Sequence, residues 1–169
     1  MLFADDSELL IAAYYCVESH DIGAQSATIC AGSCSDSTPV LSGNRRSVRF
    51  SGASALVKKD TTIYIAATSS NMKYILSLNR TTGLVSPFTS VTHYVYDMIL
   101  DESRNRLLLS VGSGLAAVQL GNKQYTLVSQ SADSGRATGA LPEMLLSHPR
   151  GLVFMNESTL LVADTFNNR

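Results

Sequence analysis

The stretch that decides the fold lies near the end of the chain, where Gly151-Leu152-Val153-Phe154 is followed by a polar turn and then by Leu160-Leu161-Val162-Ala163. Both apolar runs have the length of a strand and are too short for a helix. Two such runs joined by a short polar turn are typical of a β-hairpin. The end of the chain is therefore predicted to form an antiparallel hairpin.

The same pattern occurs three more times. Apolar runs that begin at Leu9, Ile63 and Leu107 also follow polar turns, and the starts of the four runs are separated by 54, 44 and 53 residues. Propeller blades, each a four-stranded antiparallel sheet, recur every ~40–50 residues. We therefore predict an all-β protein of β-propeller blades, with hairpins centred near residues 7, 60, 103 and 157.

This repeat predicts one partial propeller over residues 1–169, with about three and a half blades at 1–32, 48–90, 91–129 and 145–169. Two stretches rich in Ser, Gly and Asp, Ser33 to Ser47 and Gln130 to Met144, are expected to be inserted surface loops. The blade count predicts a fragment of a ring, which further chain or another copy could complete.

The last unit resembles a known family. Pro149, Gly151 and the run Val162-Ala163-Asp164-Thr165-Phe166-Asn167-Asn168-Arg169 are similar to the signature of the NHL repeat, and the similarity is sharpest from His148 to Arg169. The resemblance implies a propeller that is commonly six-bladed and used mostly for protein, ligand or occasionally RNA recognition. Some relatives with similar blades are hydrolases or lyases that depend on metal ligands in the central channel.

The sequence favours a non-catalytic binding or scaffold module over such an enzyme. Where the last unit has Asp164, the other three have Ala13, Ala67 and Val111, and one acid in four cannot form a metal site by itself. The histidines, which a metal site or triad would need to converge, occupy inequivalent positions at His20, His93 and His148. No catalytic residue, metal or cofactor is assigned, and a metal-dependent hydrolase or lyase remains the alternative.

Charge and hydrophobicity limit the classes of partner that the chain is expected to bind. The 13 basic and 14 acidic side chains give a net charge of −1, which disfavours nucleic acid. No apolar stretch approaches the roughly 20 residues that span a bilayer, and the acidic residues within Met1 to Ala13 disfavour a signal peptide. The compartment stays open, so the sequons at Asn79 and Asn156 would matter only in a secreted chain.

The three cysteines are too few for a disulfide framework, and we expect buried, unreactive thiols at Cys16, Cys30 and Cys34. Asp101, Ser103 and Asn105 alternate like calcium ligands, but they lack the glycine and distal glutamate of such a loop. A hairpin turn is the favoured interpretation of that segment.

Binding is expected on one propeller face. Each of the two insertions would connect the outer strand of one blade to the inner strand of the next. These connections are expected on the same face as the turns between second and third strands, and loops on a rigid scaffold often carry function. Exposed aromatic and arginine side chains tend to dominate interfaces. The candidate contact residues for a protein or small-molecule ligand are Tyr14, Tyr15, Arg45, Arg46, His148, Arg150 and Phe166.

Overall fold

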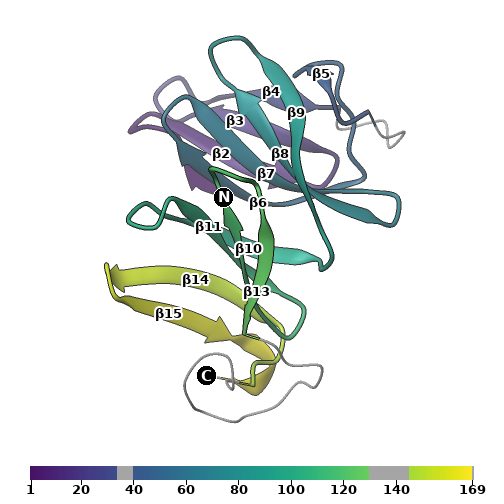
Figure 1. Ribbon diagram of the computed structural model, residues 1–169. Coiled ribbons are helices and arrows are strands. Elements are labelled where there is room, and N and C mark those ends of the chain that lie inside the picture. The colour runs from purple at the N-terminus through teal and green to yellow at the C-terminus, as the bar shows by residue number, and fades with distance from the viewer. Residues whose placement is uncertain (34–39, 130–144, 169) are drawn as a thin grey trace. The chain divides into compact units, whose positions relative to one another are not determined.

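The computed structural model describes residues 1–33, 40–129 and 145–168, and within them the protein is all-β, which confirms the predicted fold class (Figure 1). These residues form four antiparallel sheets and one short 3₁₀ helix, η1 (Thr165–Asn167), without an α-helix. No helix in this part of the chain is long and apolar enough to cross a membrane. The predicted insertion at Gln130 to Met144 lies outside the described residues.

The chain forms two compact units, Met1–Thr92 and His93–Arg169. The first unit holds a four-stranded sheet with the strand order β1 (Leu2–Phe3), β2 (Glu8–Ala13), β3 (Cys16–Asp21) and β4 (Ser26–Gly32). It also holds a five-stranded sheet with the order β5 (Gly43–Asn44), β9 (Leu84–Val91), β8 (Met72–Asn79), β7 (Thr62–Ser69) and β6 (Gly52–Lys59).

The second unit holds a four-stranded sheet with the order β10 (Val95–Asp101), β11 (Arg106–Val111), β12 (Gly114–Gln119) and β13 (Tyr125–Ser129). Its other sheet is the hairpin of β14 (Pro149–Asn156) and β15 (Thr159–Asp164). The four predicted hairpins are confirmed as β1–β2, β6–β7, β10–β11 and β14–β15.

The register shows that the sheets share one backbone design. In three strand pairs, β6–β7, β10–β11 and β14–β15, the register shifts by one residue near the start of the first strand. The shift leaves one residue of that strand without a partner across the pair, and these residues are Ser54, Tyr96 and Arg150. The last two strands of three sheets slip in the same way, leaving Cys30, Phe88 and Val128 as the extra residues. Such β-bulges bend a strand and re-aim the side chains beside them.

The core of the first unit joins its two sheets. Phe50, which precedes β6, is fully buried together with Leu10 of β2, Ile65 of β7 and Leu76 of β8. In the second unit Leu115, Leu146 and Leu152 are buried against partly exposed neighbours of β10, β13 and β15. Each hairpin therefore buries its apolar face against a neighbouring sheet of its own unit, as isolated hairpins require for stability.

The β10–β11 turn is a hairpin turn, as the sequence favours. The Asp101 carboxylate accepts hydrogen bonds from Ser103 Oγ at 2.8 Å and from Arg106 Nε at 2.8 Å. Burial works to raise the pKa of Asp101, but the hydrogen bonds from Arg106 and Ser103, with the charges of Arg106 and Arg104, hold it below its usual value. The carboxylate is thus ionised and closes the turn.

The cysteines differ from the expectation in one respect. Cys30 is a buried free thiol, and burial raises its pKa, which makes it a poor nucleophile as expected. Cys16, in contrast, is disulfide-bonded, so the prediction of an unreactive thiol at this position is wrong. Sequence spacing gave no sign of this, because the pairing of cysteines depends on the path of the chain in three dimensions. Cys34 lies outside the described residues.

Candidate functional site

The structure separates the seven candidate contact residues into three groups. Tyr14 and Tyr15 lie together at the β2–β3 turn, and Arg45 and Arg46 follow β5. His148, Arg150 and Phe166 come from the second unit, where the rings of His148 and Phe166 lie 4.5 Å apart between centroids. The last group is the most convergent of the three.

Two tyrosines complete this group. The Tyr96 ring lies 6.1 Å from that of His148 and 5.2 Å from that of Tyr94. The guanidinium of Arg150 lies over the Tyr96 ring, 5.3 Å from its centroid, within the range of a cation–π contact. We refer to Tyr94, Tyr96, His148, Arg150 and Phe166 as the aromatic–arginine cluster.

The repeated bulge explains why Tyr96 and Arg150 meet. They are the extra residues at the same position of β10 and β14. The two strands are neighbours in the second unit, where Asp97 Oδ2 accepts a hydrogen bond from the Leu152 N–H at 2.8 Å. Equivalent positions on adjacent strands bring the ring and the guanidinium together.

Asp164 positions the other half of the cluster. This buried carboxylate accepts hydrogen bonds from the Ser147 N–H at 2.7 Å and from Asn167 Nδ2 at 2.8 Å. The Phe166 N–H in turn donates to the Ser147 carbonyl at 3.0 Å. The residue before His148 is thereby tied to the 3₁₀ turn that carries Phe166.

His148 is the most constrained member. Its φ of 48° lies in the left-handed region, and such strain is retained where the surrounding structure enforces it. Its Nδ1 is buried and has no hydrogen-bond partner among the residues that the structure describes.

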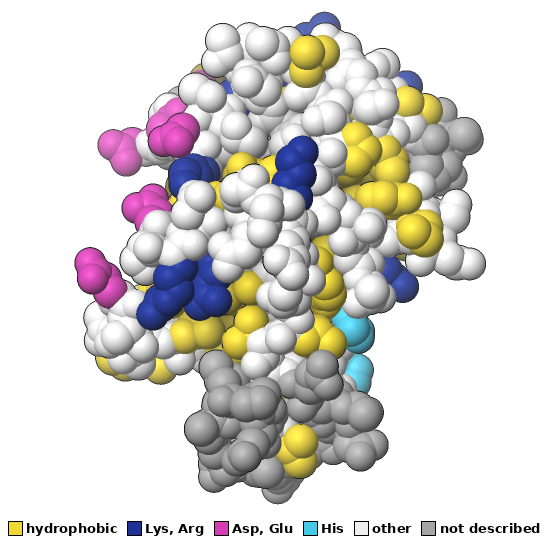
Figure 2. All heavy atoms as spheres, in the orientation of Figure 1, with side chains coloured by type: hydrophobic (Ala, Val, Ile, Leu, Met, Phe, Trp, Pro, Cys, Tyr) yellow, Lys and Arg dark blue, Asp and Glu magenta, His cyan; other side chains and the backbone are white. Residues whose placement is uncertain are grey.

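The cluster is accessible from solvent. Phe166 is 58% exposed and Tyr94 is 40% exposed, and Arg150 is exposed as well. Figure 2 shows side chains of the same kinds, hydrophobic and basic, at the surface of the drawn face. Within the described ranges, Arg150 forms no ion pair. The surface thus offers aromatic area and an uncompensated cation.

The other two groups lie in the first unit. The rings of Tyr14 and Tyr15 make an edge-to-face contact at 4.7 Å, and Tyr14 is 62% exposed. We expected the arginines to lie with the turns between second and third strands, which include Ser69 to Asn71. Arg45 instead bonds to Gly83 of the β8–β9 turn, because β5 pairs with the start of β9, at the other end of β8.

Sequence reasoning missed Tyr94 and Tyr96. The sequence repeat could have pointed to Tyr96, because Tyr96 on β10 occupies the position that Arg150 holds on β14 of the following repeat. It also missed Arg80, which the fold brings beside Arg45 and Arg46. Across the described residues, no group of three or more His, Cys, Asp and Glu side chains could hold a metal ion.

No protein-family model matches the chain, and no curated protein matches it. The structure is similar to the extracellular domain of a putative one-component system from B. thetaiotaomicron, with a TM-score of 0.51 and 10% identity over 93% of this chain. The chain spans 25% of that protein's length. A computationally designed protein, Ika8, is similar over 94% of this chain and 55% of its own, with 15% identity and a TM-score of 0.47. At 10% identity the likeness to the extracellular domain concerns the fold alone.

Proposed function

We propose that the protein is a non-catalytic binding module, and that the aromatic–arginine cluster contacts a protein segment that presents carboxylate side chains. The observation that carries this proposal is the convergence of Arg150 and Phe166 on Tyr96 and His148. The resemblance of His148 to Arg169 to the NHL repeat supports a propeller context. Under the same proposal, these blades belong to a six-bladed ring completed by further chain or another copy.

The chemistry of the cluster favours this kind of partner. Tyrosine and arginine are enriched among the residues that carry most of the energy of an interface. Arg150 is exposed, has no acidic partner in the described part of the chain, and rests on a ring that limits its motion. A carboxylate could accept two parallel hydrogen bonds from its guanidinium. Phe166 offers apolar area beside that contact.

A peptide-library selection tests the proposal. We expect the immobilised full chain to enrich peptides that contain Asp or Glu beside an apolar residue. The variants Arg150→Gln and Phe166→Ala should each weaken binding of the selected peptides about tenfold, which corresponds to roughly 1.4 kcal/mol. Matched controls are Arg104→Gln and Met155→Ala, which alter exposed residues of the same unit outside the cluster and should change affinity less than about twofold.

The proposal is wrong if the selection enriches no acidic peptides. It is equally wrong if the enriched peptides bind the two cluster variants as tightly as they bind the controls. Circular dichroism of each variant establishes that the sheets are intact.

A further inference from the structure

A second feature, in the first unit, lies apart from the proposed partner surface. A cavity of about 340 Å³ is lined by three arginines, by residues of the β8–β9 turn and by the last residue of β5. We refer to this cavity as the basic pocket, and its lining residues are Asn44, Arg45, Arg46, Arg80, Thr81, Thr82 and Gly83.

The pairing of β5 with β9 builds the pocket. Asn44 lies opposite Leu84, and the N–H of Arg45 donates to the carbonyl of Gly83 at 2.7 Å. These contacts bring Arg45 and Arg46 beside a turn that lies far from them in the sequence. The position of the two arginines is therefore set by backbone hydrogen bonds.

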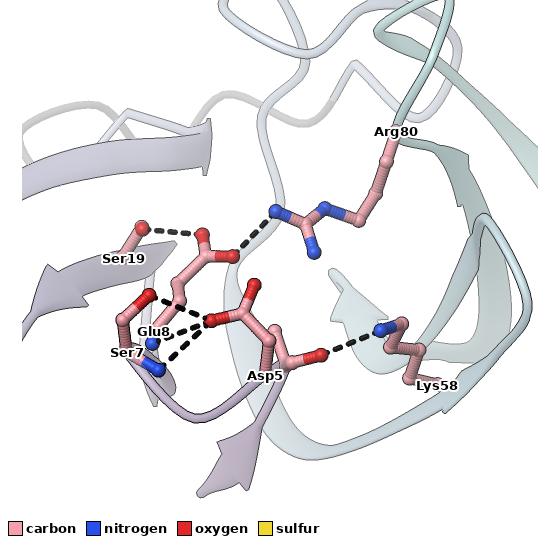
Figure 3. A network of polar contacts seen from close by, with 7 residues as sticks. Asp5, Ser7, Glu8, Ser19, Lys58 and Arg80 are labelled. Carbon is pink, nitrogen blue, oxygen red and sulfur yellow. Dashed lines mark hydrogen bonds and ion pairs between the residues drawn. The ribbon is translucent and has the colours of Figure 1, made fainter.

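The third arginine, Arg80, is held by an acidic side chain of β2. Figure 3 shows the guanidinium of Arg80 directed toward the carboxylate of Glu8, with which it forms an ion pair. Glu8 is held in turn by Ser19, whose hydroxyl donates to it at 2.6 Å. The backbone N–H of Arg80 donates to the Thr61 carbonyl at 2.8 Å. A guanidinium has five N–H donors, and the contact with Glu8 leaves others available to a ligand.

The charges in the pocket do not balance. No carboxylate lines it, and Arg45 and Arg46 form no ion pair with any residue that the structure describes. Glu8 compensates one of the three positive charges, which leaves two. Like charges held close together repel, and an anion in the cavity would relieve that repulsion.

We infer that the basic pocket binds a doubly charged tetrahedral oxyanion, a phosphate or sulfate group. Two uncompensated guanidiniums match its charge, and the planar donor fork of arginine matches the oxygens of such groups. A phosphate monoester supplies both charges, whereas a sulfate ester supplies similar oxygens with a single negative charge, so the phosphate monoester should bind more tightly.

Isothermal titration calorimetry of the full chain tests the inference, with sodium sulfate and sodium phosphate as probes at an ionic strength fixed by sodium chloride. We expect saturable binding with one anion per chain. Arg46→Gln should weaken it at least fivefold, because Arg46 is exposed and its side chain has no other role in the described structure. Lys73→Gln is the matched control, since it removes one positive charge at the other end of β8 and should change the affinity less than twofold.

The pH dependence of binding and a comparison of two esters distinguish a phosphate ligand from a sulfate ligand. A phosphate monoester becomes doubly charged above a second pKa of about 6, and inorganic phosphate does so at a somewhat higher pH. The affinity of both should therefore rise between pH 6 and pH 8, while that of sulfate stays constant. Phosphoserine and a monosaccharide sulfate then report which ester binds more tightly. An absence of saturable heat with both ions overturns the inference. Equal weakening by Arg46→Gln and Lys73→Gln overturns it too, because it would reveal a diffuse charge effect.

Discussion

The substitution Asp164→Ala tests whether one buried carboxylate holds the aromatic–arginine cluster together. Asp164 is 2% exposed and bonds to the Ser147 N–H and to Asn167 Nδ2. The loss of a hydrogen bond to a charged group costs about 1.5–3 kcal/mol, and a buried donor left without a partner adds to that cost. Relief of the carboxylate's own desolvation offsets part of the loss. We therefore expect the free energy of unfolding of the second unit to fall by about 3 kcal/mol.

Thermal unfolding measures this change, which corresponds to a fall in the melting temperature of roughly 12–24 °C for a unit of this size. Hydrogen exchange of the Ser147 amide gives the local readout, because its acceptor disappears. Asp164→Asn keeps one oxygen as a neutral acceptor and should lose about half as much stability. Asp6→Ala alters an exposed aspartate and should stay within about 0.5 kcal/mol of the wild type. A loss below about 1 kcal/mol for Asp164→Ala, with unchanged protection of the Ser147 amide, would refute the reasoning.

Two further predictions follow from the polar and covalent contacts. The depressed pKa of Asp101 contributes stability that is present above its unfolded pKa of about 3.9 and is lost as the pH falls through its lower folded value. Acid titration monitored by circular dichroism should therefore show a steeper loss of stability below pH 4 in the wild type than in Asp101→Asn. Reduction of the Cys16 disulfide should cost about 2–4 kcal/mol, so a thiol reductant should lower the melting temperature of the wild type and of Cys30→Ser but not of Cys16→Ser.

The hairpins could be predicted from the sequence because each carries its own signal, an apolar run on both sides of a polar turn. Strand β5 could not, since Gly43 and Asn44 have neither apolar character nor alternation, and only the neighbouring β9 makes them a strand. The basic pocket was missed for the same reason. Arg80 meets Arg45 only through that pairing, and no local pattern encodes it.

The aromatic–arginine cluster shows how a repeated backbone can produce a site that a single repeat lacks. In the five-stranded sheet the bulge of β6 carries Ser54, whereas the equivalent bulges of β10 and β14 in the second unit carry Tyr96 and Arg150. Serine at this position can form neither a ring platform nor a cation. The contact needs two adjacent strands that carry complementary residues at one register position, and β10 and β14 meet that requirement. The bulge fixes where the side chains project, and divergence between repeats fixes what they can bind.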